Sequence, residues 1–373
     1  MKPVHYIIPT AAIGGAEKRF IELWAYLREN QDQFNLKLVI SAALLQAIRA
    51  NETLYKLVSP HEAHISVYDI SFDEPVISFQ KKLYRFVCEH VPKNDIVHFI
   101  LSFPTYIFPV RHMKSVYSLT ESSLGNVNIK GRLLYLLNIF RARQADIIDP
   151  AVYRKLCKYF FYKKHRIHCT PGSFTDTSVF KPVQYGNKEN WFVFLGRFFY
   201  VKQSVRLLET LPHVCQKLHD AGITGYKFIF LGYGQQETEM QQILQTEAFR
   251  NLPVEMHMAH DPETILAKSK VIFSVQLRNN YPSKSLLEGM SAGNIPLVTD
   301  VGTTRLMAAP DFSYYVPEQF TANDIAGGLI SILSLDNIQV QQKMEAARTF
   351  VENNYSIRSS AAYYISLYSK FDC

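Results

Sequence analysis

The sequence lacks the features that mark a membrane-spanning or a disulfide-stabilised protein. No run of 18 or more apolar residues occurs in its 373 residues, which argues against a membrane-spanning helix. It has only five cysteines, an odd number without a C-x-x-C pair, which argues for a reducing compartment and against a structural zinc site. They are Cys88, Cys157, Cys169, Cys215 and Cys373. We therefore expect a folded, soluble, cytoplasmic protein.

Two motifs of nucleotide chemistry are also absent. No Asp-x-Asp pair occurs, although this is the usual carboxylate arrangement for a divalent cation on a nucleotide diphosphate, so we expect no metal site. The glycine loops Gly14-Gly15 and Gly232-Tyr-Gly234 do not complete the G-x-G-x-x-G fingerprint. A Rossmann-type dehydrogenase is therefore the least favoured function.

Positive charge is present in excess and is concentrated in one segment. The formal net charge is +7, and residues 128–166 contain ten cationic residues against only Asp146 and Asp149. The cations are Lys130, Arg132, Arg141, Arg143, Arg154, Lys155, Lys158, Lys163, Lys164 and Arg166. With aromatic residues between them, they suit an anionic membrane face or a polyanionic substrate, although two core helices with solvated basic faces would give the same pattern. No nucleic-acid-binding module is recognisable, so we do not expect nucleic acid as a partner.

One architecture occurs twice along the chain. Val4–Ile8 predicts a strand that is followed by a loop of small residues and a helix, and Trp191–Leu195 predicts a second such strand. Short apolar strands that alternate with helices are typical of parallel sheets covered on both faces. We predict an α/β protein with two Rossmann-like, doubly wound parallel-sheet domains facing across a cleft. Turn residues cluster at 170–182, which places the boundary near residue 180.

The segment Asn280–Gly293 is the first candidate site. Its Pro-Ser turn opens a short helix in which Leu286, Leu287 and Met290 can face a core, which would leave Glu288 pointing away from the packing. Such a turn offers free backbone N–H groups, and Glu288 can accept hydrogen bonds from a diol such as a ribose. An ordinary helix with a solvated Glu288 is the alternative.

Arg197 and Lys202 form the second candidate site. A strand end places Arg197 at the edge of the sheet where ligands bind, and the helix that begins just beyond can bring Lys202 toward the same place. Two cations there would neutralise a diphosphate, with partial positive charge added by the helix N-terminus. Two unrelated surface cations would give the same sequence.

The ordered set of these motifs resembles retaining glycosyltransferases of family 4, also described as glycosyl transferases group 1. The set is Gly14-Gly15-Ala-Glu17, Gly196-Arg197 through Lys202, Gly232-Tyr-Gly234 and Tyr281-Pro-Ser-Lys-Ser-Leu-Leu-Glu288. The resemblance covers essentially the whole chain. It implies a GT-B fold with an acceptor-binding domain at 1–180, a nucleotide-sugar-binding domain at 181–352, and a C-terminal helix at 353–373 that crosses back to the first domain.

The resemblance also implies roles for individual residues. Arg197 and Lys202 would act catalytically on the diphosphate, and Glu288 would hold the ribose. The full donor-binding set would be Gly14, Gly15, Arg197, Lys202, Gly232, Asn280, Tyr281, Pro282, Ser283, Lys284, Ser285 and Glu288. The nucleotide-sugar is a substrate, and no cofactor is implied.

The sequence departs from the family pattern at two places. The family has two glutamates flanking the helix-opening turn, and here Asn279 or Asn280 stands in place of the first. The family also often has a His-Asp or His-Gly pair after a mid-domain strand, where this chain has Thr120-Glu121. Glu121 is a catalytic candidate, and Thr120 and His98 are candidates for acceptor binding. A structural role for His98 is the alternative.

These features predict a metal-independent, retaining transfer of a sugar from a nucleotide-sugar to a glycan or lipid-linked acceptor. Surface-polysaccharide or lipopolysaccharide synthesis, with segment 128–166 against the inner face of the cytoplasmic membrane, would suit the basic segment. The alternatives are an inactive or weakly active GT-B partner protein and a nucleotide-sugar epimerase.

Overall fold

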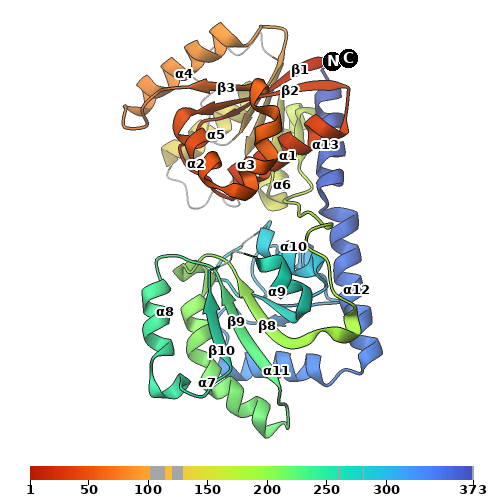
Figure 1. Cartoon of the computed structure of the whole chain (residues 1–373). Helices are drawn as coiled ribbons and strands as arrows, with labels where there is room; N and C mark the ends of the chain where they lie inside the picture. The colour runs from red at the N-terminus through yellow and green to blue at the C-terminus, as the bar shows by residue number, and fades with distance from the viewer. Residues whose placement is uncertain (101–113, 120–128, 259–260, 280, 372–373) are drawn as a thin grey trace. The chain divides into compact units, whose positions relative to one another are not determined.

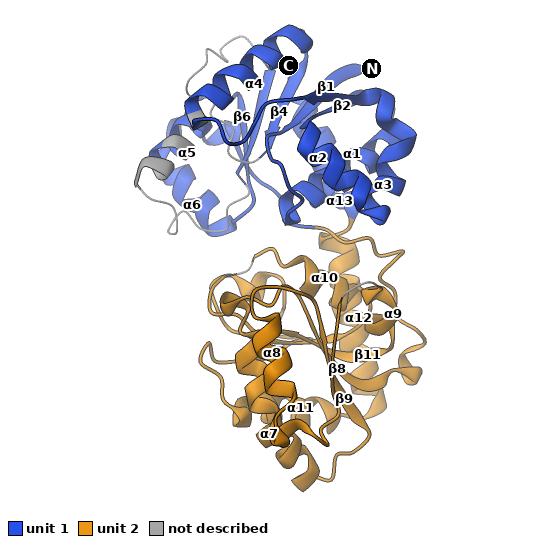
Figure 2. Cartoon of the chain, turned by 60° about the vertical axis from the view of Figure 1, so that its left-hand side comes forward, with its two compact units in different colours: residues 1–173, 357–373 blue, residues 174–356 orange. Residues whose placement is uncertain are grey.

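The computed structural model describes residues 1–100, 114–119, 129–258, 261–279 and 281–371. The chain forms two compact units (Figure 2). Unit 1 consists of Met1–Ser173 together with Ile357–Cys373, and unit 2 consists of Phe174–Ser356. The domain boundaries expected near residues 180 and 352 therefore lie a few residues away from the borders of the compact units.

Unit 1 is built on a seven-stranded sheet in the order β3-β2-β1-β4-β5-β6-β7, with every pair parallel. The strands are β1 (Lys2–Ile8), β2 (Phe34–Ser41), β3 (Ile65–Tyr68), β4 (Ile96–Ile100), β5 (Lys114–Leu119), β6 (Gln144–Ile147) and β7 (Ile167–Cys169). The helices are α1 (Gly15–Asn30), α2 (Ala42–Ala50), α3 (Glu52–Val58), α4 (Val76–His90), α5 (Ile129–Arg141), α6 (Pro150–Tyr159) and α13 (Ile357–Ser369), with short 3-10 helices η1 (Ser59–His64) and η4 (Phe161–Arg166).

Unit 2 is built on a six-stranded parallel sheet in the order β10-β9-β8-β11-β12-β13. The strands are β8 (Glu189–Leu195), β9 (Tyr226–Leu231), β10 (Val254–His257), β11 (Ser269–Ser274), β12 (Ile295–Thr299) and β13 (Tyr314–Val316). The helices are α7 (Ser204–Asp220), α8 (Glu237–Leu244), α9 (Pro262–Lys268), α10 (Lys284–Ser291), α11 (Ala322–Leu333) and α12 (Asn337–Asn354), with 3-10 helices η5 (Tyr185–Asn187), η6 (Tyr200–Lys202), η7 (Glu247–Phe249) and η8 (Thr304–Leu306).

The apolar strand β8 shows why helices cover both faces of this sheet. Successive side chains of a strand point to opposite faces. Phe192 and Phe194 accordingly pack in the core with α7 and α11, whereas Val193 and Leu195 pack in the core with α10 and α12. Figure 1 shows these helices on the two sides of the strands. A continuous apolar run is thus what a strand buried on both faces requires.

The strand order determines where a ligand can bind in unit 2. The sheet runs outward in one direction from β8 through β9 to β10, and in the other direction from β11 through β12 to β13. The neighbours β8 and β11 therefore form the switch point, and ligands of open α/β sheets bind beyond the carboxyl ends of the strands at this point.

Candidate functional site

Two glycine loops meet at the carboxyl ends of β8 and β9. The Phe198 N–H donates to the Tyr233 carbonyl at 2.8 Å. A Cβ atom on Gly232 would lie 1.9 Å from the Gly196 carbonyl oxygen, and one on Gly234 would lie 2.7 Å from the Phe198 carbonyl oxygen. Only glycine allows this approach of the two backbones. The contact fixes the loop that carries Arg197.

Lys202 is the last residue of the short helix η6. The C-cap residue Gln203 follows it in the left-handed conformation, at φ 51°. Its ammonium group donates to Oε1 of Gln276 at 3.1 Å. Burial, and next the positive charge of Arg197, lower the pKa of Lys202 from 10.5 to about 8. The structure therefore brings together the two cations that the sequence singled out.

Gln276 is a site residue that the sequence reasoning missed. Its backbone N–H donates to Thr299 Oγ1 at 2.8 Å, and its side-chain amide donates to Ser274 Oγ at 2.9 Å. Thr299 also donates to the Gln276 carbonyl at 2.9 Å. The ends of β11 and β12 thus fix the group that accepts from Lys202. Its only signal in the sequence is a polar residue just after the mostly apolar segment 271–275, at a strand end.

The predicted turn and helix at 281–291 are present, and the helix is α10. Ser283 is the N-cap, and its hydroxyl accepts from the Leu286 N–H at 3.4 Å. The Ser283 N–H donates to Sδ of Met307 at 3.2 Å, and Lys284 Nζ lies 6.0 Å from the centre of the Phe174 ring. The helix N-terminus adds partial positive charge to this part of unit 2. Asn280 lies outside the described residues.

Glu288 does not point away from the packing, as the helical pattern predicted. Its side chain is only 9% exposed, and its neighbours Leu287, Gly289 and Met290 are buried as well. The physical reason is close contact on more than one side of α10. A Cβ atom on Gly289 would lie 2.7 Å from Cγ1 of Ile272 in β11, and α12 packs against the same helix. Glu288 is therefore a nearly buried carboxylate rather than a solvated one.

Asn279 braces the loop after β12. Its Oδ1 accepts from the Thr303 N–H at 3.1 Å and from the Thr303 hydroxyl at 2.9 Å. A Cβ atom on Gly302 would approach the Asn279 Cβ to 2.5 Å, so this loop needs glycine. The residue that we considered a substitute for the first family glutamate thus already uses its side-chain oxygen within the protein.

The remaining predicted donor residues, Gly14 and Gly15, belong to unit 1. They follow β1, and α1 begins at Gly15. The Gly14 N–H donates to Oε2 of Glu17 at 2.9 Å, which caps the helix by a buried carboxylate.

His98 lies inside unit 1, where it offers no surface to an acceptor. Its Nδ1 is 2.8 Å from the Tyr368 hydroxyl, its Nε2 is 2.7 Å from Ser118 Oγ, and the side chain is 0% exposed. Burial, and next the charge of Arg19, lower the pKa of His98 to about 3, so the ring is neutral. This placement fits the structural role of His98 that the sequence left open. Thr120 and Glu121 lie outside the described residues.

The C-terminal unit is similar in sequence to a known family. The profile of the family described as Glycosyl transferases group 1 matches residues 177–354, nearly all of unit 2. No curated protein matches the sequence significantly.

Solved structures are similar over the whole chain. A glycosyltransferase from Rickettsia africae ESF-5 has 14% identity over 99% of this chain and 98% of its own, with a TM-score of 0.74. HepE of Anabaena, solved with UDP and glucose, has 12% identity over 99% and 100%, with a TM-score of 0.75. A TarM mutant of S. aureus, solved with fondaparinux, alpha-GlcNAc-glycerol and UDP, has 10% identity over 99% and 100%, with a TM-score of 0.73. The prediction of two Rossmann-like parallel-sheet domains of the GT-B type is thereby confirmed.

Proposed function

We propose that this protein is a retaining glycosyltransferase of family 4, which moves a sugar from a nucleotide-diphosphate sugar to a glycan or lipid-linked acceptor. Its residues 177–354 match the family described as Glycosyl transferases group 1. The observation that carries the proposal is the pair Arg197 and Lys202, fixed at the switch point of the unit 2 sheet. Two neighbouring cations at such a point complement the two charges of a diphosphate.

Each part of the site has a role in this reaction. Arg197 and Lys202 neutralise the diphosphate as the bond to the sugar breaks and negative charge develops on the leaving group. The turn at 281–285, with the N-terminus of α10, holds a phosphate or the sugar. Glu288, held by the packing of α10, accepts hydrogen bonds from the ribose hydroxyls. Because the protein's own cations supply the charge, we propose that the transfer needs no metal ion.

A uridine nucleotide is the first donor to test. The Anabaena structure contains UDP and glucose, and the S. aureus structure contains UDP. For the present chain we propose a UDP-sugar as the donor. The proposed acceptor belongs to cell-surface polysaccharide or lipopolysaccharide synthesis.

A thermal-shift panel of UDP, GDP, ADP and CMP, with and without EDTA, tests the donor site. We expect UDP to raise the melting temperature most, with no effect of EDTA. Lys202→Met should weaken nucleotide binding roughly 10- to 100-fold, because a hydrogen bond to a charged group is lost. Lys217→Met on the exposed face of α7 is the matched control and should bind as wild type does. If nucleotide raised the melting temperature of both variants equally, Lys202 would have no role in nucleotide binding.

The arrangement of Asn279 favours a second candidate function. An asparagine that already braces Thr303 supplies no negative charge beside a cationic transition state, which fits a GT-B partner protein with little or no turnover. Donor hydrolysis or sugar transfer by the purified protein would eliminate this alternative. Conversion of the donor sugar without any acceptor would instead identify a nucleotide-sugar epimerase.

A further inference from the structure

A group of apolar side chains in unit 1 lies exposed rather than in the core. On α5, Leu133, Leu137 and Phe140 are 55%, 43% and 44% exposed. Their spacing of four and three residues places them on one side of the helix, so they form an outward apolar stripe. At the end of α6 Tyr159 is 73% exposed, and at the start of η4 Phe161 is 75% exposed. Core helices with solvated basic faces would have turned these residues inward.

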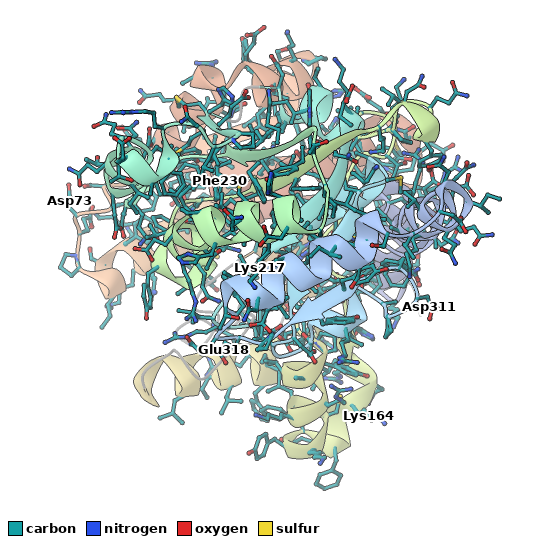
Figure 3. All side chains as sticks on the ribbon, turned by 90° about the horizontal axis from the view of Figure 1, so that it is seen from below. Asp73, Lys164, Lys217, Phe230, Asp311 and Glu318 are labelled. Carbon is teal, nitrogen blue, oxygen red and sulfur yellow. The ribbon has the colours of Figure 1, made fainter. Side chains whose placement is uncertain are left out.

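The stripe and the segment after α6 form one surface. Lys163 Nζ in η4 lies 3.5 Å from the centre of the Phe140 ring and donates to the Phe140 carbonyl at 2.9 Å. The rings of Phe161 and Tyr162 are 5.6 Å apart. We call one set of side chains from α5, α6 and η4 the basic aromatic surface; Lys164, one of them, is labelled in Figure 3. It consists of Leu133, Leu137, Phe140, Arg154, Lys155, Lys158, Tyr159, Phe161, Tyr162, Lys163 and Lys164.

The charge of this surface has one sign. Residues 128–166, with ten cations and two carboxylates, carry a net charge of +8, one more than the +7 of the whole chain, so all other residues together carry −1. Both carboxylates are buried, and neither reaches this surface. Asp146 accepts from Ser118 and from two tyrosines of α13, and Asp149 caps α6.

We propose that the basic aromatic surface binds the interface of an anionic lipid bilayer. Lysine and arginine attract the phosphate headgroups, each by about 1 kcal/mol near a charged surface. The aromatic rings, with the leucines of α5, enter the boundary between headgroups and acyl chains. Exposed leucines have no partner in a nucleic acid, which favours lipid over RNA. No helix of the described chain is long and apolar enough to cross a membrane, so this contact lies along the surface of the bilayer. The inference does not rest on the proposed transfer reaction.

Sedimentation with lipid vesicles tests the proposal on the full-length protein. Wild type is expected to bind vesicles of phosphatidylcholine with 30% phosphatidylglycerol, and not vesicles of phosphatidylcholine alone. Lys155→Glu with Lys158→Glu should lower binding by at least about tenfold, because two cations become two anions. Tyr159→Ser with Phe161→Ser should also lower binding, and should leave a remainder that disappears at 0.5 M salt.

Control variants in unit 2 separate this surface from general effects of charge and exposure. Lys217→Glu removes an exposed lysine, and Ile338→Ser removes an apolar side chain that is 70% exposed; both should bind vesicles as wild type does. Three results would overturn the proposal. Wild type could fail to bind anionic vesicles, the aromatic variant could bind as wild type does, or a single-stranded RNA could bind to the same residues more tightly than the vesicles.

Discussion

At the scale of single residues, the protonation state of Lys202 determines the charge that the proposed site offers to a ligand. Its pKa of about 8 means that an appreciable fraction of the free protein has a neutral Lys202 in mildly alkaline solution. A bound diphosphate would stabilise the charged form and raise the pKa of the side chain. Binding above pH 8 must then include the uptake of a proton.

We therefore predict that affinity for the nucleotide diphosphate is constant below pH 8 and falls as the pH rises above 8. The decrease should approach tenfold per pH unit until the pKa of the bound state is reached. Calorimetric titration from pH 6.5 to 9.5 measures it. Lys202→Met should remove the pH dependence, and Gln276→Leu, which deletes the acceptor of the ammonium group, should move the midpoint to lower pH. Constant wild-type affinity over the whole range would contradict the assignment.

At the scale of elements, Lys188 joins three parts of unit 2. Its buried ammonium group donates to the carbonyls of Leu266, Ser269 and Ala292, at 3.3, 2.6 and 2.8 Å. These carbonyls belong to α9, to the start of β11 and to the end of α10. Burial lowers the pKa of Lys188 to about 7.

Lys188→Met should destabilise unit 2 by roughly 1–3 kcal/mol, because the Ala292 carbonyl loses its donor and the Leu266 and Ser269 carbonyls keep only the Asn294 amide. The loss should increase with pH. The folded pKa lies below the unfolded value of 10.5, so the unfolded state binds more protons between pH 7 and 10.5, and wild-type stability gains from a rise in pH over this window. Urea unfolding at pH 6.5 and 9 compares the two proteins. A difference that shrinks toward pH 9 would show that the ammonium form provides the stability.

The helix α13 is attached to unit 1 by buried hydroxyl groups. Tyr363 and Tyr364 donate to the Asp146 carboxylate at 2.6 and 2.8 Å, and Tyr364 also accepts from Arg19 at 3.1 Å. Tyr368 donates to the Tyr6 hydroxyl at 2.8 Å. Burial raises the pKa of Asp146, so its charge depends on these donors.

Tyr364→Phe should weaken the attachment of α13 by roughly 1–3 kcal/mol, since a buried carboxylate loses one donor. Hydrogen exchange of residues 357–369 should become faster while exchange in unit 2 stays unchanged. Tyr159→Phe is the matched control, because it makes the same chemical change at an exposed position. Equal exchange rates in the two variants would mean that the hydroxyl contributes nothing to the attachment.

The sequence predicted the elements whose signals are local. The apolar run of β8 and the glycines of the two loops define a strand and its turn without reference to distant residues. The predictions that failed concern contacts with segments far along the chain. Glu288 is buried because β11 and α12 cover α10. His98 is enclosed by Tyr368, 270 residues away. Gln276 escaped notice because its role depends on Lys202, which is 74 residues earlier.

At the scale of the whole molecule, unit 2 is inserted into unit 1. The chain leaves unit 1 after Ser173 and returns to it at Ile357. At the edge of unit 2 these two passages are joined, because Thr175 N–H donates to the Tyr355 carbonyl at 3.0 Å and Thr175 forms a parallel bridge with Ser356.

Deletion of 357–373 should therefore damage the first unit rather than the last. Unit 1 loses α13 and two of the three donors of Asp146, whereas unit 2 keeps all its strands and the pair Arg197 and Lys202. Calorimetry should show one transition that moves to lower temperature and a second that nucleotide still shifts upward. Loss of the nucleotide-dependent transition would mean that the stability of unit 2 depends on α13.

The insertion also gives the two units a defined order of completion during synthesis. A ribosome finishes every strand and helix of unit 2 before it makes α13. Until then unit 1 is a sheet whose interior carboxylate, Asp146, lacks two of its three tyrosine and serine donors. The half of the protein that is translated first is therefore the half that matures last, and a nascent chain stalled near residue 356 would carry a finished unit 2 on an unfinished unit 1.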